Sequence, residues 1–130
     1  MAKKSILAFI FLAIFANAPA RDDFPRQSSL VALLASPTSF DGATVIIAGY
    51  VCRSGDHGYG LFLTRSDCDD LNYSNGVRLM VDLVQKKIPE GAALLTVEGR
   101  FKDLSQTIQT DEPFLWGVIE AYNLSGPSLP

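Results

Sequence analysis

The sequence predicts a single, mostly β-stranded domain: a five-stranded antiparallel barrel with one short helix at its N-terminal side. Three observations indicate this class. Five segments have strand-like patterns, only one segment has clear helical spacing, and about 110 residues follow an apolar N-terminal stretch. Helices are too few for the crossovers of a parallel sheet, and a chain of this length suits one core. We therefore expect residues 21–130 to form one domain.

The N-terminal segment has the three parts of an export signal. Lys3 and Lys4 form a basic start, residues 5–15 are continuously apolar, and the small residues at 16–20 contain two A-x-A patterns. Such an apolar run is short for a transmembrane helix but typical of a signal peptide. We expect residues 1–20 to be removed by cleavage after Ala20, with the domain exported to the periplasm or secreted. The alternative, a retained membrane anchor, lacks a stop-transfer sequence.

Each structural element follows from a local pattern. A helix through Ala35 is expected because apolar residues recur on one face, at Leu30, Leu33 and Leu34. Ser28 or Ser29 would cap its start and Pro37 would end it. The glycine-rich segment 53–60 joins the first two strands as a hairpin. Strands are expected where residues are β-branched or alternate in polarity, at 43–52, 61–64, 77–83, 94–101 and 115–124.

Alternation within the strands predicts which side chains fill the barrel. Successive side chains of a strand point to opposite faces, so one register fixes both the inner and the outer set. The expected outer set includes Thr96, Glu98 and Arg100. The expected core is Val45, Ile47, Leu61, Leu63, Val77, Leu79, Val81, Leu95, Val97 and Ile119.

A series of short motifs runs along residues 28–124: the helix, a nearby proline, F-D-G at 40–42, a strand that contains G-Y at 49–50, and T-V-E-G-R-F at 96–101. This series resembles a group of small exported bacterial OB-fold proteins of largely uncharacterised function. The resemblance implies an OB-fold-like barrel and brings no catalytic residues. OB folds in general hold ligands on the face of strands 2 and 3 with the flanking loops.

Cys52 and Cys68 are the only cysteines, and an even number in an exported chain favours a disulfide. A hairpin would place Cys52 opposite Leu61, and a straight continuation would carry Cys68 too far away to bond. Residues 65–75 would therefore have to turn back over the hairpin. Their polar sequence permits this turn and can hold one helical turn capped by Ser66. Free cysteines are the alternative.

Two groups of residues have metal-ligand chemistry without metal-ligand spacing. Cys52, Cys68, His57 and Asp56 would bind zinc only with reduced cysteines, and their spacing matches no zinc finger or ribbon. The acidic segment 67–75 resembles a calcium loop in composition, but it has no central glycine and no terminal glutamate. We expect no metal and no cofactor.

The charge of the mature chain argues against nucleic acid and against anionic membranes as partners. Without Lys3 and Lys4, nine Lys and Arg stand against fourteen Asp and Glu, a net charge of −5. Lys86-Lys87 is the only adjacent basic pair that is left. Phosphate binding needs clustered cations interleaved with stacking aromatic residues, and this pattern is missing.

The catalytic inventory is small, with one histidine and no nucleophile elbow, phosphate loop or HExxH motif. Glu98 and Glu120 form the best carboxylate pair, with Arg78 and Arg100 to neutralise them. Surface ion pairs across strands are the more common reason for such a set. Aromatic residues near strand ends indicate binding instead. The residues expected to contact a ligand are Tyr50, Tyr59, Arg78, Glu98, Arg100, Trp116 and Glu120.

We interpret the chain as an exported, non-enzymatic binding module for a protein or a small polar ligand. An inhibitor or immunity-type protein that blocks a secreted enzyme is the alternative, compatible with the small size and net acidity. A carboxylate-dependent enzyme comes third, because it would need a cleft that gathers Glu98, Glu120 and Arg78.

Overall fold

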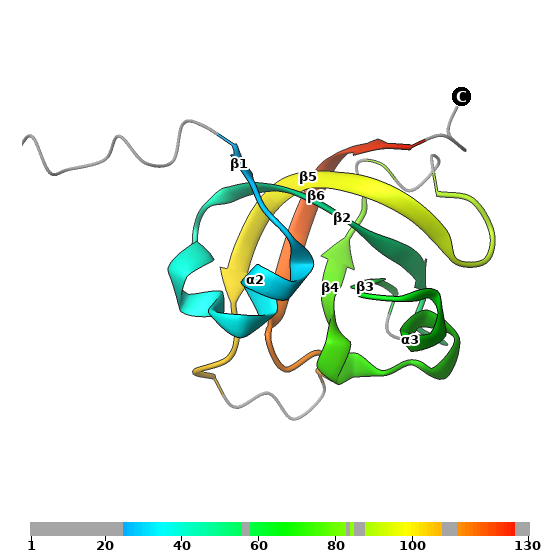
Figure 1. The fold of residues 1–130 in the computed structure, drawn as a ribbon, viewed down its shortest axis with the longest axis horizontal. Helices are drawn as coiled ribbons and strands as arrows, with labels where there is room; N and C mark the ends of the chain where they lie inside the picture. The colour runs from blue at the N-terminus through cyan, green and yellow to red at the C-terminus, as the bar shows by residue number, and fades with distance from the viewer. Residues whose placement is uncertain (1–24, 56–57, 83, 85–87, 108–111, 127–130) are drawn as a thin grey trace, which may run out of the picture.

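The computed structural model describes residues 25–55, 58–82, 84, 88–107 and 112–126 (Figure 1). The expected signal peptide lies outside these residues, and so do Asp56, His57 and the Lys86-Lys87 pair. The described part is mostly β, with a closed five-stranded barrel and two short α-helices.

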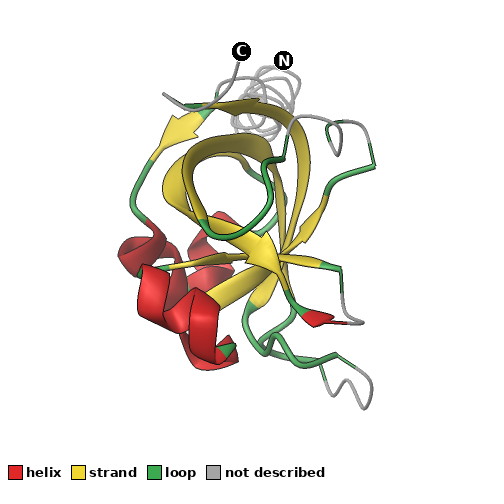
Figure 2. Cartoon of the chain, turned by 90° about the vertical axis from the view of Figure 1, so that its right-hand side faces the viewer, coloured by secondary structure: helices red, strands yellow, loops and turns green. Residues whose placement is uncertain are grey.

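Five strands form the barrel wall. Their order is β2-β3-β4-β6-β5, and pairing between β5 and β2 closes the wall. Figure 2 shows the strands curling round into this wall, with the helices outside it. The two-residue strand β1 (Arg26–Gln27) adds to the edge of β2. The barrel strands are β2 (Thr44–Arg53), β3 (Tyr59–Phe62), β4 (Gly76–Met80), β5 (Ala93–Asp103) and β6 (Gly117–Ser125).

The prediction of an all-antiparallel barrel is wrong at one pair of barrel strands. β4 pairs with β6 in parallel from Arg78 to Met80. The added strand β1 also pairs in parallel, with β2. A parallel pair needs a crossover connection. β5 supplies it here, because it follows β4 in sequence but lies between β6 and β2 in the barrel. Side chains alternate in the same way in parallel and in antiparallel strands, so the sequence pattern could not distinguish the two kinds of pairing.

A helix lies at the predicted N-terminal position, α2 (Leu30–Ala35), but a second α-helix, α3 (Arg65–Asp70), is also present, so the expectation of a single helix is only partly met. The hydroxyl of Ser29 caps it by accepting a hydrogen bond from the backbone N–H of Ala32 at 3.1 Å. A 3₁₀ helix, η1 (Pro37–Phe40), follows directly and begins with the proline, whose fixed φ suits that position. Leu30 and Leu33 are buried, so α2 contributes its apolar face to the barrel core.

The main core is the predicted one. Nine of the ten expected residues are buried, and the tenth, Leu63, is partly buried and packs against the others. Local alternation placed them correctly because each strand has one face toward the core. The core also contains residues that the pattern did not single out: Phe40, Val84, Ala121 and Leu124.

A β-bulge interrupts the pairing of β5 with β6. Glu98 lies opposite Asn123 and Gly99 lies opposite Ala121, so Tyr122 is the extra residue. A Cβ atom at Gly99 would collide with the carbonyl oxygen of Glu120, which explains the glycine at this point. The bulge leaves Tyr122 on the outside of the barrel beside Glu98.

Candidate functional site

The predicted disulfide between Cys52 and Cys68 is present, with 6.1 Å between the two Cα atoms. The chain turns back through a second helix, α3 (Arg65–Asp70), where the sequence indicated one helical turn. Its cap is Thr64 rather than Ser66. In the β2–β3 hairpin Cys52 lies opposite Gly60, one residue from Leu61, which was expected at this place. The disulfide therefore fastens α3 onto the outside of β2.

We expect the double variant Cys52→Ala/Cys68→Ala to lower the free energy of unfolding by about 3 kcal/mol, because the closed loop no longer restricts the unfolded chain. Urea unfolding of the mature protein measures the loss. Adding a thiol reductant should bring the parent protein down to the stability of the variant and leave the variant unchanged. Equal stability of parent and variant without reductant would show that the bond contributes nothing.

Asp67 holds the start of α3 and the loop that follows it. Its Oδ1 accepts hydrogen bonds from the side-chain amides of Asn72 at 3.1 Å and Asn75 at 3.2 Å. Its own backbone N–H donates to the Thr64 hydroxyl at 3.0 Å. Desolvation opposes ionisation, but the hydrogen bonds from Thr64, Asn75 and Asn72 outweigh it and lower the pKa of Asp67 below 3.8. The acidic segment 67–75 is therefore held together by hydrogen bonds to the Asp67 carboxylate.

We expect the Asp67 carboxylate to stabilise the fold above about pH 4 and to lose this effect as the pH falls through its lowered pKa. Asp67→Asn should therefore cost roughly 1 kcal/mol at pH 7 and less at about pH 2. Urea unfolding at both pH values measures the difference. Asp69→Asn, on the same helix and exposed, is the control and should be neutral at both. A constant cost for Asp67→Asn at every pH would refute the role of the charge.

A second hydrophobic cluster lies outside the barrel, over β3. Cys52, Phe62, Cys68 and Phe114 are buried in it, with partly buried side chains around them. The Phe62 and Phe114 ring centroids are 5.6 Å apart, and Tyr73 meets Phe114 edge-on at 4.8 Å. A Cβ atom at Gly60 would lie 2.5 Å from the Phe114 ring, so the glycine makes room for that ring. The outer face of β3 is therefore filled by the chain's own aromatic residues.

The segment from Glu112 to Trp116 carries Phe114 into this cluster. The Glu112 side chain, only 9% exposed, forms a salt bridge with Arg78 and accepts a hydrogen bond from the backbone N–H of Phe114. The indole N–H of Trp116 donates to the carbonyl oxygen of Ser74 at 2.9 Å. Arg78 and Trp116 thus fasten this segment. Arg78 pairs with Glu112, not with the carboxylates that the sequence analysis assigned to it.

Two other predicted ligand residues also pack within the molecule. Tyr50 is partly buried against the second cluster, and the guanidinium of Arg65 lies 5.5 Å from its ring centroid. Tyr59 is partly buried against the main core, with the guanidinium of Arg53 5.6 Å from its ring. Their contacts are of the cation–π type.

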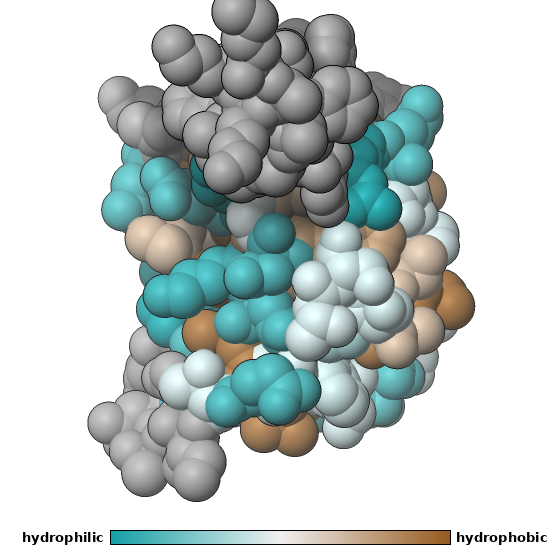
Figure 3. Space-filling view, turned by 90° about the vertical axis from the view of Figure 1, so that its left-hand side faces the viewer, coloured by the Kyte–Doolittle hydropathy of each residue, from teal (hydrophilic) through white to brown (hydrophobic). Residues whose placement is uncertain are grey.

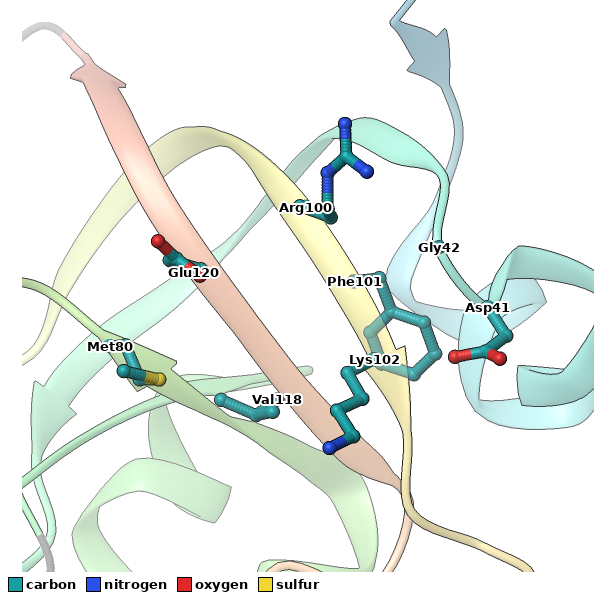
Figure 4. A pocket seen from close by; sticks show the side chains of 8 residues that line it. All are labelled: Asp41, Gly42, Met80, Arg100, Phe101, Lys102, Val118 and Glu120. Carbon is teal, nitrogen blue, oxygen red and sulfur yellow. The ribbon is translucent and has the colours of Figure 1, made fainter. Parts of the chain in front are cut away.

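The outer face formed by β4, β5 and β6 is different, because it contains a hollow of about 300 Å³ (Figure 4). Arg100 and Glu120 line it from directly opposed positions of β5 and β6. Met80 reaches it because β4 runs beside β6, and Met80 lies opposite Glu120. The hollow is lined by Asp41, Gly42, Met80, Arg100, Phe101, Lys102, Val118 and Glu120.

Only part of this lining could be predicted from the sequence. Arg100 and Glu120 were expected, whereas Val118 and Lys102 were not. Val118 occupies an outward position of the predicted strand 115–124, and Lys102 lies one residue beyond the predicted strand 94–101 and belongs to β5 in the structure. Met80 was found only through the parallel pair, which no local pattern reveals. A smaller hollow of about 170 Å³ adjoins the first and shares Met80 and Glu120.

The seventh predicted residue, Glu98, lies on the same outer face. Its carboxylate accepts a hydrogen bond from the hydroxyl of Tyr122 at 3.2 Å. Partial desolvation, and then the adjacent Glu98 charge, raise the pKa of Tyr122 above 10.0. Glu98 therefore contacts Tyr122, whereas Glu120 lines the hollow. Their roles in binding stay predictions.

Among the residues that the structure describes, no three His, Cys, Asp or Glu side chains gather as a metal site would require. No helix in the described ranges combines the length and the apolar character needed to cross a bilayer. On the face that Figure 3 shows, the coloured atoms are hydrophilic to neutral over most of the area, and apolar atoms gather along its right-hand edge.

Comparison with known proteins gives no match to a protein-family model and no match to a curated protein. Function must therefore be argued from the chain's own side chains.

Proposed function

We propose that this chain is an exported binding module without catalytic activity, built on an OB-fold-like barrel. Its partner is a protein, which it contacts through the outer face of β4, β5 and β6. The observation that carries the proposal is the hollow on this face, where Arg100 and Glu120 surround apolar side chains.

This face is preferred because its hollow is open, whereas the outer side of β3 is covered by other parts of the chain. OB folds in general bind ligands on strands 2 and 3, which correspond to β3 and β4 here. The outer side of β3 is occupied by Phe62 and Phe114, both fully buried. A ligand there would first have to displace the chain's own rings. The hollow needs no such displacement.

The composition of the hollow supports a protein partner more than a small polar ligand. Its volume, about 300 Å³, is at the lower end of the range for small-molecule pockets. Met80 is 43% exposed and Tyr122 is 45% exposed on the same face. Met, Tyr and Arg are enriched at protein interfaces, where apolar contacts are surrounded by polar groups.

Export is supported by the signal-like N-terminus and by the disulfide, since disulfides persist mainly in oxidising compartments. Mass spectrometry of the mature protein should give a chain that starts at Arg21. A mature chain that retains the apolar segment 5–15 would contradict export by cleavage.

A charge-swap variant tests the binding face. Arg100→Glu/Glu120→Arg keeps the net charge and keeps opposite charges on directly opposed positions, so we expect the fold to survive. The mature parent, the swap variant and the exposed control Glu90→Gln are immobilised and exposed to an extract of the exported compartment. A protein retained by parent and control but not by the swap variant supports the proposal. Equal retention by all three contradicts it.

The alternative functions predict different results in this experiment. An inhibitor or immunity-type role predicts that the retained protein is a secreted enzyme whose activity falls on binding. A carboxylate-dependent enzyme predicts turnover that disappears in Glu120→Gln without any retained protein.

We also expect the mature domain not to bind nucleic acid at physiological salt, about 0.15 M. The reason is its net charge of −5 and the carboxylates interspersed with Arg78 and Arg100. Fluorescence anisotropy with random single strands at micromolar protein measures this. Saturable binding that weakens steeply with added salt would reverse the expectation.

A further inference from the structure

The hollow on β4, β5 and β6 has an apolar floor. Val118 is half-buried and Met80 is 43% exposed, and the fully buried Phe101 also contributes to the lining. Exposed apolar surface of this kind is stabilised when an apolar group covers it. The space of about 300 Å³ suits a single amino-acid side chain with its adjoining backbone.

The rim carries two charges of each sign. Figure 4 shows them around Phe101 in the order Arg100, Asp41, Lys102 and Glu120, with Met80 and Val118 to one side, beyond Glu120 and Lys102. The salt bridge between described residues joins Arg78, which lies opposite Val118, to Glu112, and it involves none of the four rim residues. Arg100 and Glu120 are directly opposed in register, yet they form no salt bridge with each other. The rim charges are therefore available to a partner.

A rim of this pattern discriminates by charge. A partner with a single sign of charge would be attracted by two rim groups and repelled by the other two. A partner with one carboxylate and one cation beside its apolar group satisfies both kinds. Asp41 is held in place because its Oδ1 accepts a hydrogen bond from the backbone N–H of Asp103 at 2.9 Å.

Backbone pairing does not offer the partner a second way to bind here. Arg100 on β5 pairs with both β2 and β6, and residues 118–120 of β6 pair with both β5 and β4, so these positions have no free strand edge. Addition of a partner strand to the sheet needs such an edge. Recognition at this face must come from side chains.

We propose that the hollow binds an apolar side chain of a partner protein that is flanked in the partner's sequence by one acidic and one basic residue. This inference rests on the proposed function and specifies its ligand. The apolar side chain covers Met80 and Val118. The flanking cation faces Glu120 or Asp41, and the flanking carboxylate faces Arg100 or Lys102.

Short peptides test the chemistry without the natural partner. Nuclear magnetic resonance follows the amide shifts of the mature ¹⁵N-labelled protein during titration. The probes with both features are Ac-Glu-Leu-Lys-NH₂ and Ac-Lys-Leu-Glu-NH₂. The comparison probes lack the apolar group (Ac-Glu-Ser-Lys-NH₂), lack both charges (Ac-Ser-Leu-Ser-NH₂) or carry one sign only (Ac-Glu-Leu-Glu-NH₂ and Ac-Lys-Leu-Lys-NH₂).

We expect at least one mixed-charge leucine peptide to shift the amides of β4, β5 and β6 and to bind about tenfold or more tightly than every comparison probe. Glu120→Gln should remove most of that preference, whereas Glu90→Gln should keep it. Equal binding of all leucine peptides, tighter binding of a single-sign peptide, or no shifts at this face with any probe would each overturn the inference. The capture experiment with the charge-swap variant uses no peptide, so it tests the proposed function independently of this inference.

Discussion

Val97→Asp is expected to unfold the domain or to remove most of its stability. Val97 is fully buried on β5 within the main core, paired with Ile47 on one side and Leu124 on the other. A carboxylate at this point would be buried without a cation or hydrogen-bond donor, which costs about 3–5 kcal/mol or leads to protonation. Small domains are stable by about 5–15 kcal/mol in total, so the loss is large.

The neighbouring variant Thr96→Asp is the control for this prediction. Thr96 is half-buried and lies on the opposite face of the same strand, between Ala48 and Ser125. Its replacement should cost no more than about 1 kcal/mol, the span of strand propensities. Thermal unfolding of both variants gives the comparison. Equal losses would show that the inward and outward faces of β5 have been exchanged.

Phe114→Ala is expected to destabilise the domain by about 3–5 kcal/mol, the usual cost of removing a buried aromatic ring. Phe114 is fully buried outside the barrel, in contact distance of Phe62 and Tyr73 and above Gly60. Its loss leaves a cavity over β3 and exposes the face that the second cluster covers.

Leu115→Ala provides the matched control, since Leu115 is the next residue and is 59% exposed. It should change the free energy of unfolding by no more than about 0.5 kcal/mol. Urea unfolding measures both variants. If Phe114→Ala were as mild as Leu115→Ala, the second cluster would not be a packed unit and the face of β3 would count as open.

Much of the fold could be predicted because the relevant signals are local. Val97 and Thr96 are neighbours on opposite faces of β5, and the alternation of polarity along a strand predicts which of the two faces the core. Ser29 predicts the start of α2, because a capping side chain bonds to backbone groups within the first turn of its own helix. The disulfide followed from the chain having only Cys52 and Cys68.

The candidate site was harder to predict because it depends on contacts between distant segments. Phe114 follows a polar stretch, and nothing near it in sequence indicates that Gly60 leaves space for its ring. Met80 lies beside Glu120 only because β4 and β6 are parallel, an arrangement that has no local pattern. Arg78 looked available for a ligand, but its partner Glu112 is 34 residues away.

The measurement that tests the proposed binding face most directly is hydroxyl-radical footprinting of the mature protein, free and bound to its captured partner. The side chains to compare are Met80 and Tyr122, on the outer face of β4 and β6, and Tyr50 and Tyr73, beside the cluster over β3. We predict that the partner protects Met80 and Tyr122 and leaves the oxidation of Tyr50 and Tyr73 unchanged. Protection of Tyr50 and Tyr73 with unchanged oxidation of Met80 would contradict the proposal and place binding over β3.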